Sequence, residues 1–402
     1  MVEKELNNFF DCYMGKESPF LDKGVLQTKY MPLNIIHRDD ELKKVGNILA
    51  PVLRGEKPSN IFIYGKTGTG KTLSIKYLTN QLLTVSNNNL KVIYLNCKLK
   101  KIADTEYRLI AQLGRELGCE IPSTGLPTDE VYKLFFNSVD MEKQLLLIVL
   151  DEVDQLVKKT GDSVLYNLTR VNEDLKNSQL SIIGISNDLM FTDNIDPRAK
   201  SSLSEEEVVF APYNAIQLQD ILRARAVKAF KNGFLTSGVI EKCAAFAARE
   251  HGDARRALDL LRVAGELAER SNCKNLEIEH IDLAERKMED EGITSLVKTQ
   301  PKQFQATLYS ILLLHSQKKE AIFTGEVYEV YKQICDKTNL APLTQRRVSD
   351  IIAELDMLGI INARVLSKGR YGRTREISLS VPLSISYKIK EILATGLGLD
   401  NI

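Results

Sequence analysis

One short stretch of the chain has the residue types and spacing of a phosphate-binding loop. It reads Gly65-Lys66-Thr67-Gly68-Thr69-Gly70-Lys71-Thr72, follows the apolar run 61–64 and precedes a helical pattern at 73–83. Glycines in a turn between a strand and a helix let backbone N–H groups approach phosphate oxygens. We therefore expect all eight residues to bind ATP or ADP, with Lys71 reaching the β- and γ-phosphates and Thr72 offering its hydroxyl to Mg²⁺.

Two carboxylates follow a second apolar run at 145–150. A continuous apolar run is typical of a buried parallel strand, and the carboxyl end of such a strand opens on the ligand crevice of an α/β sheet. This position predicts that Asp151 holds Mg²⁺ or its waters and that Glu152 polarises a water towards the γ-phosphate. Because some nucleotide switches barely hydrolyse, the pattern leaves open whether the chain turns over ATP at all.

Asn187 and Arg198 are two further candidates for a role in hydrolysis of the γ-phosphate. Asn187 follows the apolar run 181–186, where a polar side chain can position the attacking water; the alternative is a helix cap or an Asx turn. Arg198 can complete the site of a neighbouring subunit as an arginine finger, and the alternative is a plain surface arginine.

A helical region after residue 213 supplies the remaining nucleotide candidates. Asp253 is placed to cap a helix, and Arg255 or Arg256 in its first turn can swing to the nucleotide and couple its closure to the γ-phosphate. Tyr213 and Arg225 flank the point where this region begins, so either is a candidate contact to the adenine or the phosphates. Ordinary packing at a hinge is the alternative for Tyr213.

The elements that must position these residues alternate between strands and helices. Helical patterns lie at 105–117 and 128–138, and Asp39 or Asp40 is placed to cap a helix whose apolar positions run from 42 to 52. The expected strands lie at 61–64, 92–96, 145–150, 181–186 and 207–210. This order predicts an α/β fold with a parallel sheet covered on both faces.

The chain then changes character twice. Residues 217–289 read as a four-helix lid, and a polar join is expected at 291–302. Three helices and a β-hairpin follow, which is the order of a winged helix-turn-helix. The expected organisation is an N-terminal arm at 1–30, a nucleotide-binding base at 31–212, a helical lid at 213–292 and a winged-helix domain at 303–402.

The C-terminal region carries a local excess of positive charge. Residues 301–402 hold 14 basic and 10 acidic side chains, a net charge of +4 against +1 for the whole chain. A basic loop in the hairpin and the N-terminus of the third helix are the groups that reach phosphates and bases in such domains. We therefore expect contacts to DNA from Thr344, Gln345, Arg346, Arg347, Lys368, Arg370, Tyr371 and Arg373. The alternative is a solvated charge run on a winged helix that contacts protein.

Composition excludes several other classes. Six cysteines are scattered without a C-x-x-C pair and four histidines are dispersed, which disfavours a zinc site and is typical of a reduced protein. The sequence has no apolar run of ~18 residues, which is the length of a membrane span. Its first residues also lack the basic-then-apolar order of a signal peptide. We expect a soluble, cytoplasmic and nucleoid-associated protein of two or three domains, without a membrane partner.

Taken together, the motifs resemble the archaeal initiator family that joins the first subunit of the origin recognition complex and cell division control protein six. The more specific segments are Val209-Phe210-Ala211-Pro212-Tyr213 and His251-Gly252-Asp253-Ala254-Arg255-Arg256-Ala257-Leu258. The resemblance implies an AAA+ ATPase base, a helical lid and a winged helix. It assigns sensor 1 to Asn187, sensor 2 to Arg255, the arginine finger to Arg198 and an adenine-side role to His37 and Arg38, and it places a DNA-contacting helical insertion at 98–117.

These expectations lead to one function and two alternatives. The function is an ATP-dependent replication initiator that binds duplex origin DNA through its winged helix and base. It would use slow ATP hydrolysis as a switch and help recruit the replicative helicase, with other initiator paralogues as further partners. One alternative is an ATP-gated transcription regulator whose winged helix reads promoters. The other is a motor ATPase such as a clamp loader, with the C-terminal domain used for oligomer contacts.

Overall fold

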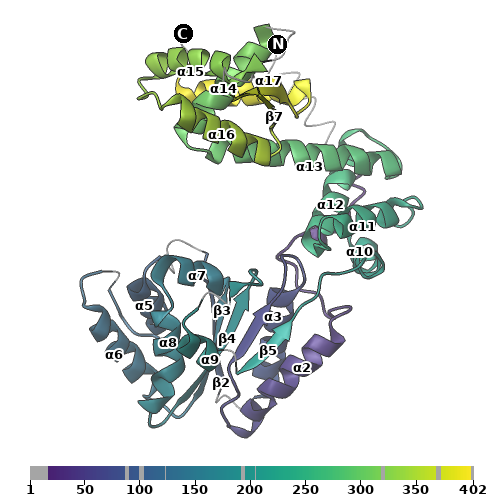
Figure 1. Cartoon of the computed structure of the whole chain (residues 1–402). Helices are drawn as coiled ribbons and strands as arrows, with labels where there is room; N and C mark the ends of the chain where they lie inside the picture. Colours follow the sequence, from purple (N-terminus) through teal and green to yellow (C-terminus); the bar gives the residue numbers. More distant parts are fainter. Residues whose placement is uncertain are drawn as a thin grey trace, which may run out of the picture. The chain divides into compact units, whose positions relative to one another are not determined.

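A computed structural model describes residues 17–86, 90–98, 104–122, 124–191, 195–203, 205–317, 322–367 and 373–399 of the 402-residue chain. The chain divides into two compact units, Met1–Ile281 and Asp282–Ile402 (Figure 1). Each unit has its own secondary structure and core, so each is described separately.

The first unit contains a five-stranded parallel sheet, which confirms the α/β expectation. Its spatial order is β2-β3-β4-β1-β5. In the register of this sheet, Asp151 at the end of β3 lies beside Asn96 of β2 and Ile185 of β4, so three strands bring their carboxyl ends to one edge. The strands are β1 (Ile61–Tyr64), β2 (Leu90–Asn96), β3 (Leu145–Asp151), β4 (Gln179–Ser186) and β5 (Glu206–Val209).

Helices cover both faces of this sheet, and the alternation of side chains along β3 explains why. Leu146, Ile148 and Leu150 pack into one core, whereas Leu145 and Val149 pack into another on the opposite face. Because all of β3 is buried, it reads as a continuous apolar run. The first core is closed by α5 (Glu106–Glu116), α6 (Thr128–Val139), α7 (Val153–Thr160), α8 (Ser163–Arg170) and α9 (Pro197–Leu203), and the second by α2 (Asp39–Leu49) and α3 (Lys71–Val85) (Figure 1).

The lid of the first unit is helical, and the N-terminal segment packs on it. Phe20 forms an isolated β-bridge with Phe230, and the buried Val25 and Leu26 belong to a short 3₁₀ helix, η1 (Lys23–Leu26), that contacts α10 and α12. The segment from residue 17 to 30 is therefore an ordered part of the lid surface. The lid helices are α10 (Ala215–Ala229), α11 (Val239–Arg249), α12 (Ala254–Arg270) and the start of α13 (Ile278–Thr299).

The second unit is a winged helix, as the sequence predicts. Its antiparallel sheet has the order β6-β8-β7, and Tyr331 lies fully buried in its core. The short strand β6 and the last helix α17 are additions that the sequence pattern does not indicate. The elements are α14 (Lys302–Gln317), β6 (Ile322–Phe323), α15 (Thr324–Thr338), α16 (Gln345–Met357), β7 (Ile361–Ser367), β8 (Arg373–Leu379) and α17 (Leu383–Leu397).

Two local expectations are wrong. The polar join expected at 291–302 is helical as far as Thr299, because Ile293, Leu296 and Val297 pack against the core of the second unit at helical spacing. Neither Asp39 nor Asp40 caps α2. The N-cap is Arg38, and both aspartates lie in the first turn, where the helix dipole favours negative charge.

The cysteines of the described residues are free, and Cys97, Cys243 and Cys335 are buried. Within the described ranges, none of the helices combines the length and apolar character needed to cross a membrane.

The helical course of α13 can be tested at Gly292, an exposed glycine within it. Among the described residues, no atom lies within 4 Å of the Cβ that an alanine would add there. Because alanine is the better helix former, we expect Gly292→Ala to raise the free energy of unfolding by about 0.5–1 kcal/mol, measured by urea denaturation.

The matched control is Gly359→Ala in the second unit. Its Cβ would also meet open space among the described atoms, but its φ is +71°. Left-handed backbone disfavours alanine, so this variant should lose about 1–2 kcal/mol. Destabilisation by both substitutions would contradict a helix at 292.

Candidate functional site

The loop between β1 and α3 has the backbone that a phosphate cradle requires. Gly68 and Gly70 take φ values of +70° and +90°, which L side chains rarely adopt, and α3 begins at Lys71 with its first N–H groups open. The Lys71 ammonium is buried and donates hydrogen bonds to the carbonyl oxygens of Gly65 and Lys66, both at 2.8 Å. These carbonyls hold the ammonium inside the curve of the loop.

The same loop lies directly against the lid. A Cβ on Gly68 would fall 1.7 Å from Oδ1 of Asp253, and the N–H of Ala254 donates to the carbonyl of Gly68 at 3.2 Å. Asp253 is the N-cap of α12, as predicted, and accepts from the N–H groups of Arg255 and Arg256. The phosphate loop and the first turn of α12 are therefore one packed unit.

Arg38 ties the loop to the junction between base and lid. Its buried guanidinium donates to the carbonyls of Thr69 and Ala211, at 2.9 Å and 2.5 Å, and to Glu41 at 2.7 Å. It also lies 3.9 Å from the ring centroid of Tyr213. The resemblance assigns His37 and Arg38 an adenine-side role, but here the Arg38 guanidinium is committed to these protein contacts. The His37 ring lies 2.9 Å from Asp220.

The predicted magnesium residues are in direct contact. Oδ2 of Asp151 accepts hydrogen bonds from the Thr72 hydroxyl, at 2.9 Å, and from the Tyr94 hydroxyl, while Oδ1 accepts from the N–H of Glu152 at 3.0 Å. Burial and the neighbouring Asp151 charge raise the pKa of Tyr94, which keeps its hydroxyl protonated and able to donate.

Glu152 and Asn187 lie beside this carboxylate. Glu152 has a φ of +55°, an uncommon conformation for a residue with a side chain and one that is concentrated at functional sites. Its carboxylate is 3.7 Å from the Lys98 ammonium. The N–H of Asn187 points to Oδ1 of the buried Asp154 at 3.5 Å. The edge of the sheet therefore brings the predicted carboxylates and amide together.

Two adjoining cavities open above these residues. The smaller, of about 260 Å³, is lined by charged and polar groups that include Lys71, Asp151, Glu152, Asn187 and Arg255. The larger, of about 610 Å³, is lined mostly by apolar residues. The two share Thr28, Gly68, Gly70, Thr72, Lys76 and Arg255.

This pair of cavities fits a magnesium nucleotide. The polar cavity offers a buried ammonium, a hydroxyl and a carboxylate, which suit phosphates and a hard cation. The apolar cavity has the volume and lining typical of sites for a base and its sugar. Its outer wall is the N-terminal segment 27–36, followed by Tyr213 and Leu258 of the lid.

The three arginine candidates have different surroundings. Arg255 lines both cavities, whereas Arg256 pairs with Glu250 at 2.9 Å. Arg225 lines the apolar cavity, but it donates to the carbonyl of Val25 at 3.1 Å and stacks over Tyr30, so it holds the N-terminal segment. Burial lowers the pKa of Arg225.

Arg198 lies elsewhere in the first unit. Its side chain is 73% exposed and pairs with Asp196 at 3.1 Å, and the described residues that line the two cavities do not include it. The hydrogen bond to Asp196 raises the pKa of Arg198.

Motifs in the sequence did not point to four parts of this site. The sequence analysis assigns residues 27–30 of the wall to the N-terminal arm and 31–36 to the base without a role at the nucleotide, although the apolar Tyr-Met-Pro-Leu-Asn-Ile-Ile run was a usable signal. Arg38 was noticed only through the resemblance. Tyr94 and Lys76 sit inside an ordinary strand and helix, where the sequence gives no sign of their place at the site.

Comparison with known proteins decides the family. Family models match at residues 54–189 (AAA domain), 219–286 (Cdc6 AAA+ ATPase-type lid domain) and 295–388 (CDC6, C terminal winged helix domain). The ORC1-type DNA replication protein of Pyrococcus furiosus is 52% identical over 396 residues, covering 97% of this chain and 93% of its own. That of Thermococcus onnurineus is 51% identical over 399 residues, covering 98% and 95%.

The chain belongs to the ORC1/Cdc6 family of DNA replication initiators. The ORC1 protein of Aeropyrum pernix, solved in complex with DNA, is 42% identical and superposes with a TM-score of 0.79 over 96% of this chain and 98% of its own. The ORC2 protein of the same organism, at 20% identity and a TM-score of 0.60, shares the fold. The resemblance drawn from the motifs is confirmed.

In the winged helix of this ORC1/Cdc6 protein, α16 presents three predicted DNA residues to solvent. Gln345, Arg346 and Arg347 are exposed, as is Thr344, the N-cap, whose hydroxyl accepts from the N–H of Arg347 at 3.4 Å. Arg347 also lies 3.8 Å from Asp350. Of the predicted wing residues, Lys368, Arg370 and Tyr371 and the side chain of Arg373 lie outside the described residues.

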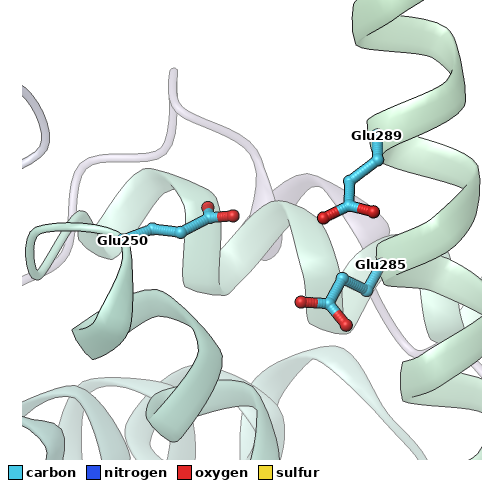
Figure 2. A group of neighbouring side chains, drawn as sticks. All are labelled: Glu250, Glu285 and Glu289. Carbon is cyan, nitrogen blue, oxygen red and sulfur yellow. The ribbon is translucent and has the colours of Figure 1, made fainter. Parts of the chain in front are cut away.

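Three glutamates lie on the lid and on α13. Glu285 and Glu289 lie one turn apart on α13, and Glu250 ends α11 (Figure 2). Glu250 already pairs with Arg256. Carboxylates are common on protein surfaces, so these three carry no metal assignment.

The buried Lys71 should make nucleotide binding by this ORC1/Cdc6 protein depend on pH. Desolvation lowers the pKa of Lys71 to about 8, and the charge of bound phosphates would raise it again. Binding above pH 8 should therefore take up a proton, and affinity should fall by up to about tenfold per pH unit there, since one pKa unit is worth about 1.4 kcal/mol. Calorimetry in buffers of different ionisation enthalpy measures this proton uptake.

The control is Lys71→Arg, whose guanidinium does not titrate in this range. It should bind nucleotide, with altered affinity, without the proton uptake at pH 8.5. The same uptake in both proteins, or none in the wild type, would contradict the assignment to Lys71.

Proposed function

We propose that this protein is an ATP-dependent initiator that binds duplex origin DNA and uses slow ATP hydrolysis as its switch. The observation that carries the proposal is the convergence of the phosphate loop, the strand-end carboxylates and the lid residue Arg255 on one two-part cavity. Residues 31–212 would form the nucleotide-binding base, 213–292 the lid and 303–402 the DNA-binding domain. Residues 17–30 would act with the lid.

The nucleotide site supports a switch that couples base and lid. Lys71 would bind the β- and γ-phosphates, and Arg255 would bind the γ-phosphate from the first turn of α12. Because Asp253 packs on Gly68, a change in the phosphate loop reaches α12 directly. Loss of the γ-phosphate would remove one of the interactions that hold the lid in place.

Thr72 and Asp151 would hold Mg²⁺, which neutralises charge on the phosphates when bound. Glu152 would polarise the attacking water and Asn187 would position it. The Glu152 carboxylate also lies 3.7 Å from the Lys98 ammonium. Arg198 is exposed, as a residue must be if it is to act on the site of a neighbouring copy.

The winged helix supplies the proposed DNA contact. The N-terminus of a recognition helix is the part that meets base edges, and Gln345, Arg346 and Arg347 are exposed there. The wing residues Lys368, Arg370, Tyr371 and Arg373 would grip phosphates. Segment 98–117 of the base would make a second contact. The DNA in the Aeropyrum pernix ORC1 structure supports this proposal. Partners at the nucleoid would be the replicative helicase and initiator paralogues.

Replacing Arg346 and Arg347 with alanine should weaken duplex binding. Removing one cation from a phosphate should reduce the slope of log Kd against log salt by about 0.9, so the double variant should show a slope smaller by about 1–2. Fluorescence anisotropy with labelled duplex between low and moderate salt measures it. The matched control replaces Lys337 and Lys388, exposed on α15 and α17, with alanine. An equal change of this slope in the control would mean that α16 adds only general positive charge and makes no specific contact with DNA.

Occupancy of the tagged protein across its genome, with footprinting of the strongest sites, tests the function itself. An initiator should give discrete peaks at replication origins, and the Arg346/Arg347 variant should protect those sites less. Peaks spread over promoters would contradict the initiator proposal and favour a transcription regulator. An absence of peaks, with brisk DNA-stimulated ATP turnover, would favour a motor ATPase.

A further inference from the structure

Tyr94 lines the polar cavity. It belongs to β2, the strand beside β3, and lies two residues before Asn96, which pairs in register with Asp151. Its hydroxyl donates to Oδ2 of Asp151, the same oxygen that accepts from Thr72. A tyrosine on the neighbouring strand thus contacts the carboxylate proposed to hold the metal.

The ring of Tyr94 is itself fixed in place. The Lys76 ammonium from α3 lies 4.1 Å from the ring centroid, and both residues line the polar cavity. The strand fixes one end of the side chain, and Asp151 holds its hydroxyl. A half-buried ring with both ends held can orient a carboxylate at little entropic cost.

The hydrogen bonds described for the Asp151 carboxylate come from three donors with different tasks. Thr72 would also face the metal, and the N–H of Glu152 belongs to the backbone. Tyr94 is the donor whose hydroxyl can be removed without changing a proposed ligand or the main chain. Groups that hydrogen-bond to metal-binding carboxylates fix their orientation and tune their affinity.

We propose that Tyr94 is a positioning residue for the metal: its hydroxyl orients Asp151 so that the divalent cation binds together with the nucleotide. This inference rests on the proposed function, since it concerns the same site. It predicts that Tyr94 affects nucleotide binding through the metal and leaves the metal-free contacts of the phosphate loop unchanged.

The test is Tyr94→Phe, which keeps the ring and its contact with Lys76. The dissociation constant of ATP is measured by calorimetry on the full-length protein, once with excess Mg²⁺ and once with EDTA. We expect the ratio of the EDTA to the Mg²⁺ constant to fall by roughly tenfold in the variant, the lower end of the effect seen when such supporting residues are removed. The EDTA constant should stay within about twofold of the wild type.

The control is Tyr64→Phe, which removes a tyrosine hydroxyl from β1 of the same sheet, where it donates to Glu207 at 3.3 Å. In Tyr64→Phe, the ratio of the EDTA to the Mg²⁺ dissociation constant should equal that of the wild type. In an Asp151→Asn background, Tyr94→Phe should change the ratio no further. A further fall of the ratio in that background would mean that Tyr94 acts through a group other than Asp151, and it would overturn the inference.

The outcomes separate this inference from the proposed function. An unchanged ratio in Tyr94→Phe, or equal losses with Mg²⁺ and with EDTA, would overturn the positioning role while leaving the ATP switch intact. Failure of the wild type to bind ATP, or binding that ignores Mg²⁺, would overturn the proposed function and the inference with it.

Discussion

The close approach of Asp253 to Gly68 is the constraint on which the site depends. The carboxylate occupies the space that any side chain at position 68 would need, so with α12 in place only glycine fits at this position. Asp253 also caps α12, and that cap fixes the direction in which the helix leaves the loop. Arg255 follows two residues later and reaches both cavities. This one packing contact therefore fixes the positions of the phosphate loop, the start of α12 and Arg255 relative to one another.

Arg38 and the N-terminal segment extend this coupling around the nucleotide. A buried guanidinium stabilises a structure only when its donors are satisfied, and Arg38 satisfies them with the phosphate loop, the base–lid junction and α2. Hydrogen bonds to a charged group are worth about 1.5–3 kcal/mol each, so this residue makes a large local contribution. On the lid side, Glu269 of α12 accepts from Ser18 and Lys23, both at 2.6 Å, and anchors the segment that walls the apolar cavity.

The sequence allows much of this arrangement to be predicted, and the failures have physical causes. The five strands and the strand-end carboxylates follow from apolar runs, because β3 is buried on both faces and its register carries Asp151 to the edge. The course of α13 from 291 to Thr299 was missed because a few apolar residues among charges decide it by tertiary packing. Tyr94 was missed as part of the site, and Arg38 entered only through the resemblance, for a related reason: their partners are distant in sequence, and their residue types are ordinary where they occur. Arg198, Arg225 and Arg255 look alike as arginines near motifs, and their contacts alone distinguish them.

The central claim is that base, lid and N-terminal segment form one nucleotide site. Amide hydrogen exchange during an ATP titration tests it most directly, because it reports the three walls at once. The account predicts slower exchange at 27–36, 65–74 and 254–258, with the same midpoint in ATP concentration for all three segments. Protection confined to 65–74, or clearly different midpoints for the lid and the N-terminal segment, would contradict it.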